Sequence, residues 1–132
     1  KPFYRFQYHV KMLSFPRPVF NENEKMIIGE IMYIDNFGNV VSNISRNFFE
    51  KNSVDFDSFL VKFRNLALTK VYDRYTEFVQ DWSREHEYHG KSVAIFNDAG
   101  LLEITIYKGN KLNGAKTLFG LEVGENIYVQ FL

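Results

Sequence analysis

The stretch YIDNFGNVVSNI (33–44) carries the residue types with the most chemical potential in this sequence. Asp35, Phe37 and Asn39 stand close together between two apolar runs. Asn and Gly suit the turn that must join those runs, but a turn does not need a phenylalanine at its tip. An exposed ring can stack on a flat ligand, and an amide, which both donates and accepts, suits a purine edge. The alternative is that Phe37 packs as a small satellite of the core.

A second polar group, REHEYH (84–89), contains two histidines and two glutamates. Only two residues separate His86 from His89, so the spacing is not that of the H-E-x-x-H zinc motif. We interpret this segment as a solvated charged loop and expect no metal site. The chain has no cysteine, which excludes disulfides, thiolate ligands and a cysteine nucleophile.

Composition favours one β-rich domain. The chain has 132 residues, of which 45% are hydrophobic and 17% aromatic, and aromatic side chains favour strands. Sixteen basic residues balance sixteen acidic ones, which argues against a nucleic-acid surface. No apolar stretch approaches the roughly 20 residues of a membrane span. We therefore expect a cytoplasmic protein without a membrane or nucleic-acid partner.

Short strands should position these residues. Alternation or apolar runs predict strands at 6–12, 26–34, 40–44, 58–63, 66–72, 92–97, 101–107 and in the last segment of the chain. Residues 14–25 read as a connecting loop, Ser45 as the cap of a short helical turn, and 113–120 as a short helix. The order contains no βαβ alternation. The predicted fold is mainly β: a small antiparallel β-barrel of about seven strands with short helical caps.

Three blocks carry a family resemblance. GEIMYIDNFGNVVSNI resembles the pattern G-x-(apolar)-x-x-I-D-x-F-G-N-x-x-(T/S)-N-I, and AIFNDAGLLEITIYKGN resembles apolar-F-N-S-x-G-x-L-E-I-A-x-x-x-G-N. LFGLEVGENIYVQF resembles L-L-G-L-x-x-G-D-x-V-x-(apolar)-x-F. These patterns, in this order, are those of the S-adenosyl-L-methionine (SAM) hydroxide adenosyltransferases, which are related to fluorinase and chlorinase.

The resemblance implies an organisation and a reaction. Family members have an N-terminal α/β domain and a C-terminal β-barrel, so residues 26–132 are expected to be that barrel and 1–25 the tail of a connector. Members assemble as homotrimers that bind SAM between the N-terminal domain of one subunit and the C-terminal domain of its neighbour. Water attacks the ribose C5′ and releases adenosine and methionine. The residues that activate water lie in the N-terminal domain, so no catalytic residue, metal or cofactor is expected here.

The resemblance also implies binding roles. Asp35 matches the aspartate that contacts the methionine ammonium group, Phe37 the aromatic packed on adenine, and Asn39 the amide that reads the adenine edge. Asn97 and Asp98 match the pair that helps to hold the methionine end. Further matches on the adenine side are Tyr75, Tyr107 and Lys108.

Two departures bear on these roles. Asp98 replaces the usual serine and places a carboxylate near the substrate carboxylate, where repulsion weakens binding. Ala99 stands where the halide-using members have arginine. Two alternatives to the enzyme remain: a small barrel that binds single-stranded nucleic acid through Phe37 and Tyr75, and an assembly module whose aromatic surface pairs subunits.

Overall fold

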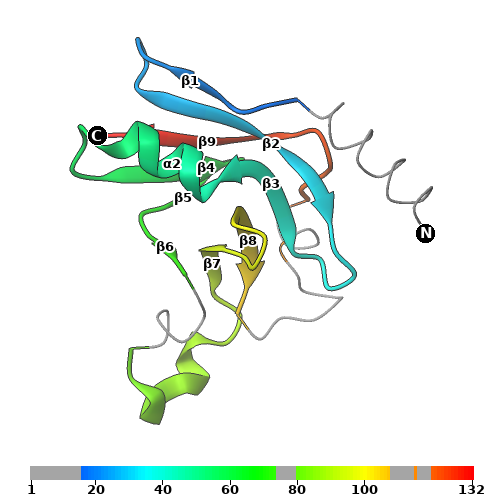
Figure 1. The fold of residues 1–132 in the computed structure, drawn as a ribbon. Helices are drawn as coiled ribbons and strands as arrows, with labels where there is room; N and C mark the ends of the chain where they lie inside the picture. Colours follow the sequence, from blue (N-terminus) through cyan, green and yellow to red (C-terminus); the bar gives the residue numbers. More distant parts are fainter. Residues whose placement is uncertain (1–15, 74–79, 108–114, 116–119) are drawn as a thin grey trace.

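The computed structural model describes residues 16–73, 80–107, 115 and 120–132. Within these residues the chain forms β1 (Val19–Asn21), β2 (Met26–Ile34), β3 (Val40–Ser45), α2 (Arg46–Ser53), β4 (Phe59–Phe63), β5 (Leu66–Leu68), β6 (Val71–Tyr72), the 3-10 helix η1 (Trp82–Tyr88), β7 (Ser92–Phe96), β8 (Leu101–Ile106) and β9 (Asn126–Phe131). Figure 1 shows the strands curling around one core, with η1 projecting from the lower end.

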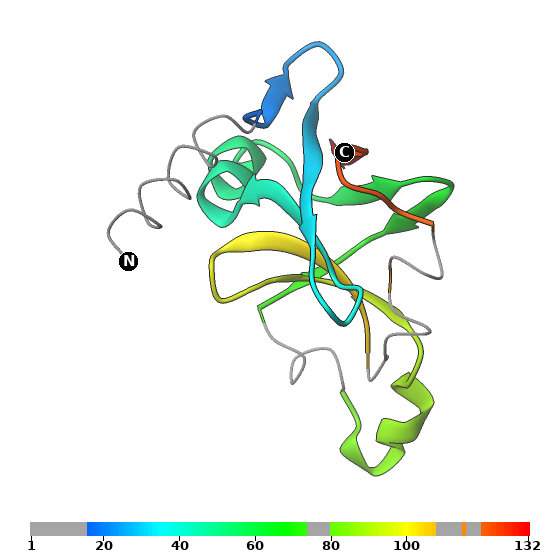
Figure 2. The same cartoon turned by 90° about the vertical axis from the view of Figure 1, so that its right-hand side faces the viewer.

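The strands form one sheet in the order β5-β4-β9-β2-β3-β8-β7-β6, and β1 pairs with β2 outside this path. Only Thr69 and Lys70 separate β5 from β6, so the chain itself brings the two edges of the sheet toward each other. The curled sheet is visible from the side in Figure 2. The predicted mainly β barrel is therefore confirmed, although β6 pairs with β7 in parallel rather than antiparallel.

Two kinds of strand build the barrel. In β2 and β9 buried and less buried residues alternate, which is the pattern of a sheet with one face on a core. In β3, β7 and β8 nearly every residue is buried, so these strands are covered on both faces. This second covered face carries the polar residues described below.

One helix closes an end of the core. The Ser45 side chain accepts a hydrogen bond from the Phe48 amide at 3.1 Å, which confirms the predicted helix cap. Helix α2 continues beyond the expected single turn and buries Phe49. Its ring meets those of Phe59 and Phe96 edge-on, with centroids 5.0 and 5.5 Å away.

Some predicted boundaries were wrong. The expected loop at 14–25 contains β1, which pairs with the start of β2 across the turn at 22–25. The single strand expected at 66–72 is two strands, β5 and β6. The strand expected at 6–12, and all but Ala115 and Gly120 of the helix expected at 113–120, lie outside the described residues.

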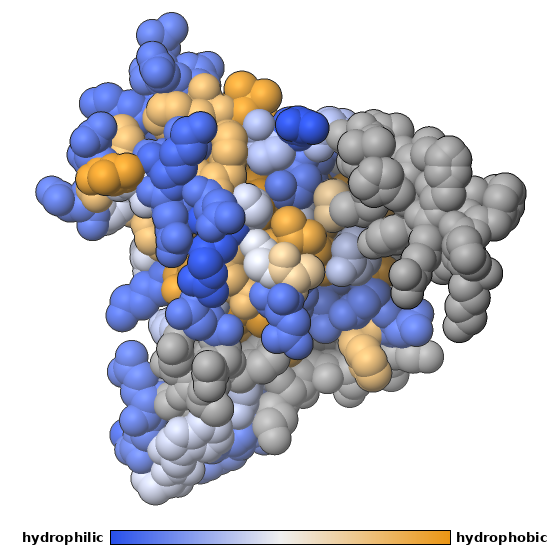
Figure 3. Space-filling model, in the orientation of Figure 1, coloured by the Kyte–Doolittle hydropathy of each residue, from blue (hydrophilic) through white to orange (hydrophobic). Residues whose placement is uncertain are grey.

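Exposed large apolar side chains are scattered rather than gathered. Val19, Val54, Leu66, Trp82 and Val123 lie on different elements or turns. On the face seen in Figure 3, apolar groups alternate with hydrophilic ones. Among the described helices, none is both long and apolar enough to cross a membrane.

Candidate functional site

The turn between β2 and β3 is organised by Asp35. Its Oδ1 accepts hydrogen bonds from the backbone amides of Phe37 at 2.8 Å and Asn39 at 3.0 Å. The Gly38 amide bonds to the Asp35 carbonyl at 3.0 Å, and Gly38 has a φ of 81°, which favours glycine. An aspartate that bonds the backbone two residues on is a common way to hold such a turn.

Phe37 projects from this turn. Its side chain is 63% exposed and lies outside the hydrophobic core cluster, so it is not the satellite of the core that was the alternative. The ring is thus presented to solvent by a turn whose backbone is pinned on both sides of it.

The Asn39 side chain is held at both ends. Its Nδ2 donates to Asp35 Oδ2 at 2.9 Å, and its Oδ1 accepts from the hydroxyl of Thr105 on β8. An amide has two N–H donors and two acceptor positions, so the contacts among the described residues use one of each.

Asn97 organises the turn between β7 and β8 in a similar way. Its Oδ1 accepts from the amides of Ala99 and Leu101, both at 3.0 Å, and its Nδ2 donates to Glu103 at 3.1 Å. Gly100 has a φ of +76° and completes the predicted hairpin. Asp98 is exposed at the tip.

Strand β8 presents a buried polar face. Leu102, Ile104 and Ile106 belong to the core cluster, whereas the residues between and after them point the other way. There Glu103 is bonded to Asn97, Thr105 to Asn39 and Tyr107 to Glu85. One strand face therefore contacts three separate segments: both turns and η1.

Glu103 lies in a negative environment. Burial raises the pKa of this carboxyl, the hydrogen bond from Asn97 lowers it, and the charges of Asp35 and Asp98 raise it further. The two turns thus bring carboxylates close enough to act on one buried group. Such an arrangement favours a positively charged ligand over an anion.

Tyr107 connects the site to η1. Its ring is buried, and its hydroxyl donates to Glu85 Oε2 at 3.1 Å. Burial and this contact with Glu85 raise the pKa of Tyr107. The same Glu85 carboxylate bonds His89 Nε2 at 2.6 Å.

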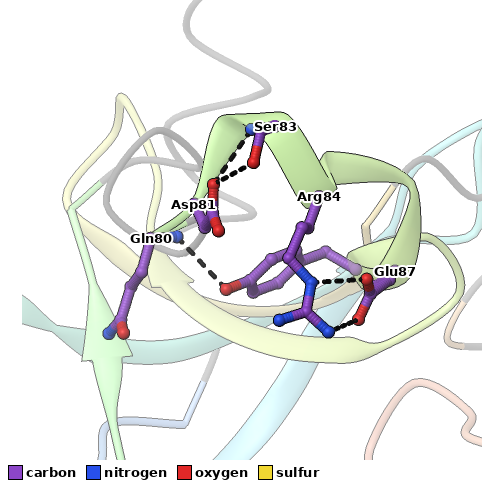
Figure 4. A network of polar contacts seen from close by, with 6 residues as sticks. Gln80, Asp81, Ser83, Arg84 and Glu87 are labelled. Atoms are coloured by element: carbon purple, nitrogen blue, oxygen red, sulfur yellow. Dashed lines mark hydrogen bonds and ion pairs between the residues drawn. The ribbon is translucent and has the colours of Figure 1, made fainter.

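Helix η1 is held by its own polar contacts (Figure 4). Asp81 accepts from the Ser83 amide and hydroxyl, and Arg84 pairs with Glu87 through two nitrogens. The expected charged loop is therefore a short helix, although its residues are mostly exposed as anticipated. Within the described residues, no three His, Asp or Glu side chains gather as metal ligands.

Six of the eight predicted site residues lie within the described part of the chain, in two turns and at the end of β8. Asp35, Phe37 and Asn39 share one turn, Asn97 and Asp98 share another, and Tyr107 follows β8. Tyr75 and Lys108 lie outside the described residues. Sequence reasoning missed Thr105, which stands where the family pattern has alanine.

Residues 29–128 match the family model described as the SAM hydroxide adenosyltransferase C-terminal domain. The chain belongs to this family. The match contains both turns and the whole of β8, so the resemblance on the three sequence blocks is confirmed. A search of curated proteins finds none that matches the chain.

Two solved structures resemble this SAM hydroxide adenosyltransferase C-terminal domain. An uncharacterized conserved protein from Thermotoga maritima is 26% identical with a TM-score of 0.62, over 89% of this chain and 40% of that one. A conserved hypothetical protein from Thermus thermophilus is 24% identical with a TM-score of 0.53, over 93% of this chain and 41% of that one. The second likeness shows the fold alone. This chain spans less than half the length of either protein.

Proposed function

We propose that this chain is the substrate-binding part of an enzyme that converts SAM and water to adenosine and L-methionine. In that reaction a water oxygen forms a bond to the ribose C5′ while the C5′–sulfur bond breaks. The sulfur keeps the electron pair and leaves as the neutral thioether of methionine, and the water loses a proton. The part of the chain described here would contribute binding and positioning rather than the activation of water.

The turn at 35–39 carries the proposal. It presents an exposed phenylalanine ring next to an amide that, in its contacts with the described residues, leaves one donor and one acceptor unused. Adenine offers a flat face for stacking, and its amino group lies next to a ring nitrogen, so its edge also has one donor and one acceptor. The roles of Phe37 as the stacking ring and Asn39 as the reader of the adenine edge fit this geometry.

The charge of the site supports a cationic substrate. SAM carries a positive sulfonium and an ammonium group, and Asp35, Asp98 and Glu103 make the region between the turns negative. Three of the acceptor positions of Asp35 are used within its own turn, which leaves capacity on Oδ2 for an ammonium donor. Asp98 would oppose the substrate carboxylate, so the methionine end should bind more weakly than the adenosine end.

The assembly is part of the same proposal. The site would be completed by an N-terminal domain of a neighbouring subunit in a homotrimer, and the chain described here would be inactive alone. The proposal needs no metal or organic cofactor, because the positive charge on the sulfonium already makes methionine a good leaving group. The proposed location is the cytoplasm.

The test uses the natural protein, with any sequence that precedes Lys1. Incubation with SAM should give adenosine and methionine in equal amounts, measured by chromatography. The double variant Phe37→Ala, Asn39→Ala should lose this activity. Trp82→Ala is the matched control, since Trp82 is also an exposed aromatic, at 56%, but lies on η1.

The alternatives give different outcomes. An assembly module would form the same oligomer in the double variant and would bind no adenosine. A nucleic-acid barrel would bind single strands with strong salt dependence. Absence of both product and adenosine binding in the natural protein would overturn the proposed function.

A further inference from the structure

The orientation of the Asn39 amide follows from the chemistry of its two partners. An ionised carboxylate can only accept hydrogen bonds, so the nitrogen end of the amide must face Asp35, at 2.9 Å. The oxygen end must then face Thr105, whose hydroxyl is the donor. Turning the amide round would bring its oxygen against the carboxylate.

Thr105 is well placed to hold that oxygen. Its side chain is only 1% exposed and it lies within β8, 66 residues from Asn39 in sequence. β8 pairs with β3 on one side and β7 on the other, so the hydroxyl is carried by a central strand rather than by a loop. A group fixed in a sheet positions its partner more rigidly than a loop residue could.

We propose that Thr105 is a positioning residue that fixes the Asn39 amide and so sets the preference of the site for a 6-aminopurine. The proposal rests on the proposed function for the identity of the ligand. Fixed in this way, the amide offers one N–H and one oxygen lone pair in a set order. Adenine matches that order with its ring nitrogen and amino group. Hypoxanthine carries an oxygen at the six position beside an N–H, which reverses the order, so a fixed amide rejects it.

The binding test compares adenosine with inosine on the natural full-length protein. Thr105→Val keeps the shape but removes the hydroxyl, and Thr105→Ser keeps the hydroxyl. Ser42→Ala is the matched control, because Ser42 is also a buried hydroxyl, but it donates to the Leu102 carbonyl at 2.7 Å and accepts from the Ile44 amide rather than bonding Asn39. Thr105→Val should weaken adenosine binding about fivefold, the effect of one lost hydrogen bond. It should also reduce the preference for adenosine over inosine, whereas the other two variants keep that preference.

A second readout needs no ligand. The side-chain amide of Asn39 gives its own pair of signals in a nitrogen-15 NMR spectrum of the free protein. Thr105→Val should shift these signals and speed their exchange with water, and Ser42→Ala should not. If Thr105→Val changes neither these signals nor the adenosine preference, the proposal is wrong. If the unaltered protein binds neither nucleoside, the proposed function fails, and the NMR comparison alone decides whether Thr105 fixes the amide.

Discussion

The side-chain amide of Asn97 donates a hydrogen bond of 3.1 Å to the buried carboxyl of Glu103. Glu103 is 8% exposed, and this is the contact that opposes its burial and the charges of Asp35 and Asp98. The pair links the β7–β8 turn to the polar face of β8.

Because of Glu103, the free energy of unfolding should fall as pH rises. Its pKa in the folded protein is raised above the ordinary 4.5. The folded state therefore binds more protons than the unfolded chain between 4.5 and the raised value, and stability is lost as pH increases through that window. Glu103→Gln should be more stable than the unaltered protein at neutral pH, with a smaller difference below pH 4.5.

Thermal melting at several pH values measures this effect. Glu122→Gln, at an exposed position, is the control. If Glu103→Gln does not raise the melting temperature at neutral pH, the prediction is wrong. The hydrogen bond from Asn97 would then compensate for the burial of the Glu103 carboxylate and for the nearby negative charges.

Tyr107 should ionise late. Its pKa is raised above 10.0 by burial and by Glu85, so it should be among the last tyrosines to give a tyrosinate signal in an absorbance titration. Tyr107→Phe should remove that late step, whereas Tyr128→Phe should leave it. Loss of an early step in Tyr107→Phe would contradict the expectation.

The structure leaves no room for a side chain at Gly29. A Cβ at this position would lie 2.5 Å from Ile44 Cγ1 and 2.8 Å from Asn43 Oδ1, both closer than van der Waals contact. Gly29→Ala should lower the free energy of unfolding by about 1–3 kcal/mol, the usual cost of overpacking. Urea unfolding measures the loss. Ile44→Ala removes both Cγ1 and the Cδ1 that would lie 2.7 Å from the new Cβ. The double variant Gly29→Ala, Ile44→Ala should therefore lose less than the two single losses combined.

Asn43 should anchor the segment before β1. Its Nδ2 donates to the Pro16 carbonyl at 2.7 Å, and its Oδ1 accepts from the Glu30 amide at 2.9 Å. Asn43→Ala should lower the free energy of unfolding by about 1–3 kcal/mol, because it removes two hydrogen bonds that each contribute about 0.5–1.5 kcal/mol. Chymotrypsin should also cleave faster after Phe20, which lies in β1. The control is Asn126→Ala, which removes an exposed hydrogen bond to Tyr128 and should change neither the stability nor the cleavage rate. If both variants are cleaved at the same rate, Asn43 does not anchor the segment before β1.

The strands and the Ser45 cap were predictable because they depend on local patterns. β1 was missed because Pro16 and Pro18 precede it and a polar turn follows, which is the composition of a loop. A short strand in such a segment exists because β2 extends far enough to pair with it. That length is a property of the assembled sheet.

The polar site was predictable only in part. Alternation places Glu103 on the opposite face of its strand from Leu102 and Ile104. It does not indicate that this second face is buried as well, because the cover over both faces of β3, β7 and β8 comes from the assembled fold. The family pattern indicated Asp35 and Asn39 as ligand contacts. It could not indicate that they bond each other, or that Thr105 completes the chain of contacts.

The place of β9 between β2 and β4 has a consequence for synthesis on the ribosome. β2 and β4 are translated early, but they contact each other mainly through β9, which pairs with both. Until residues 126–131 have left the exit tunnel, the backbone edges of β2 and β4 that pair with β9 stay without their partner. A nascent chain stalled before this point should bind chaperones that recognise exposed strands, and one released after it should not.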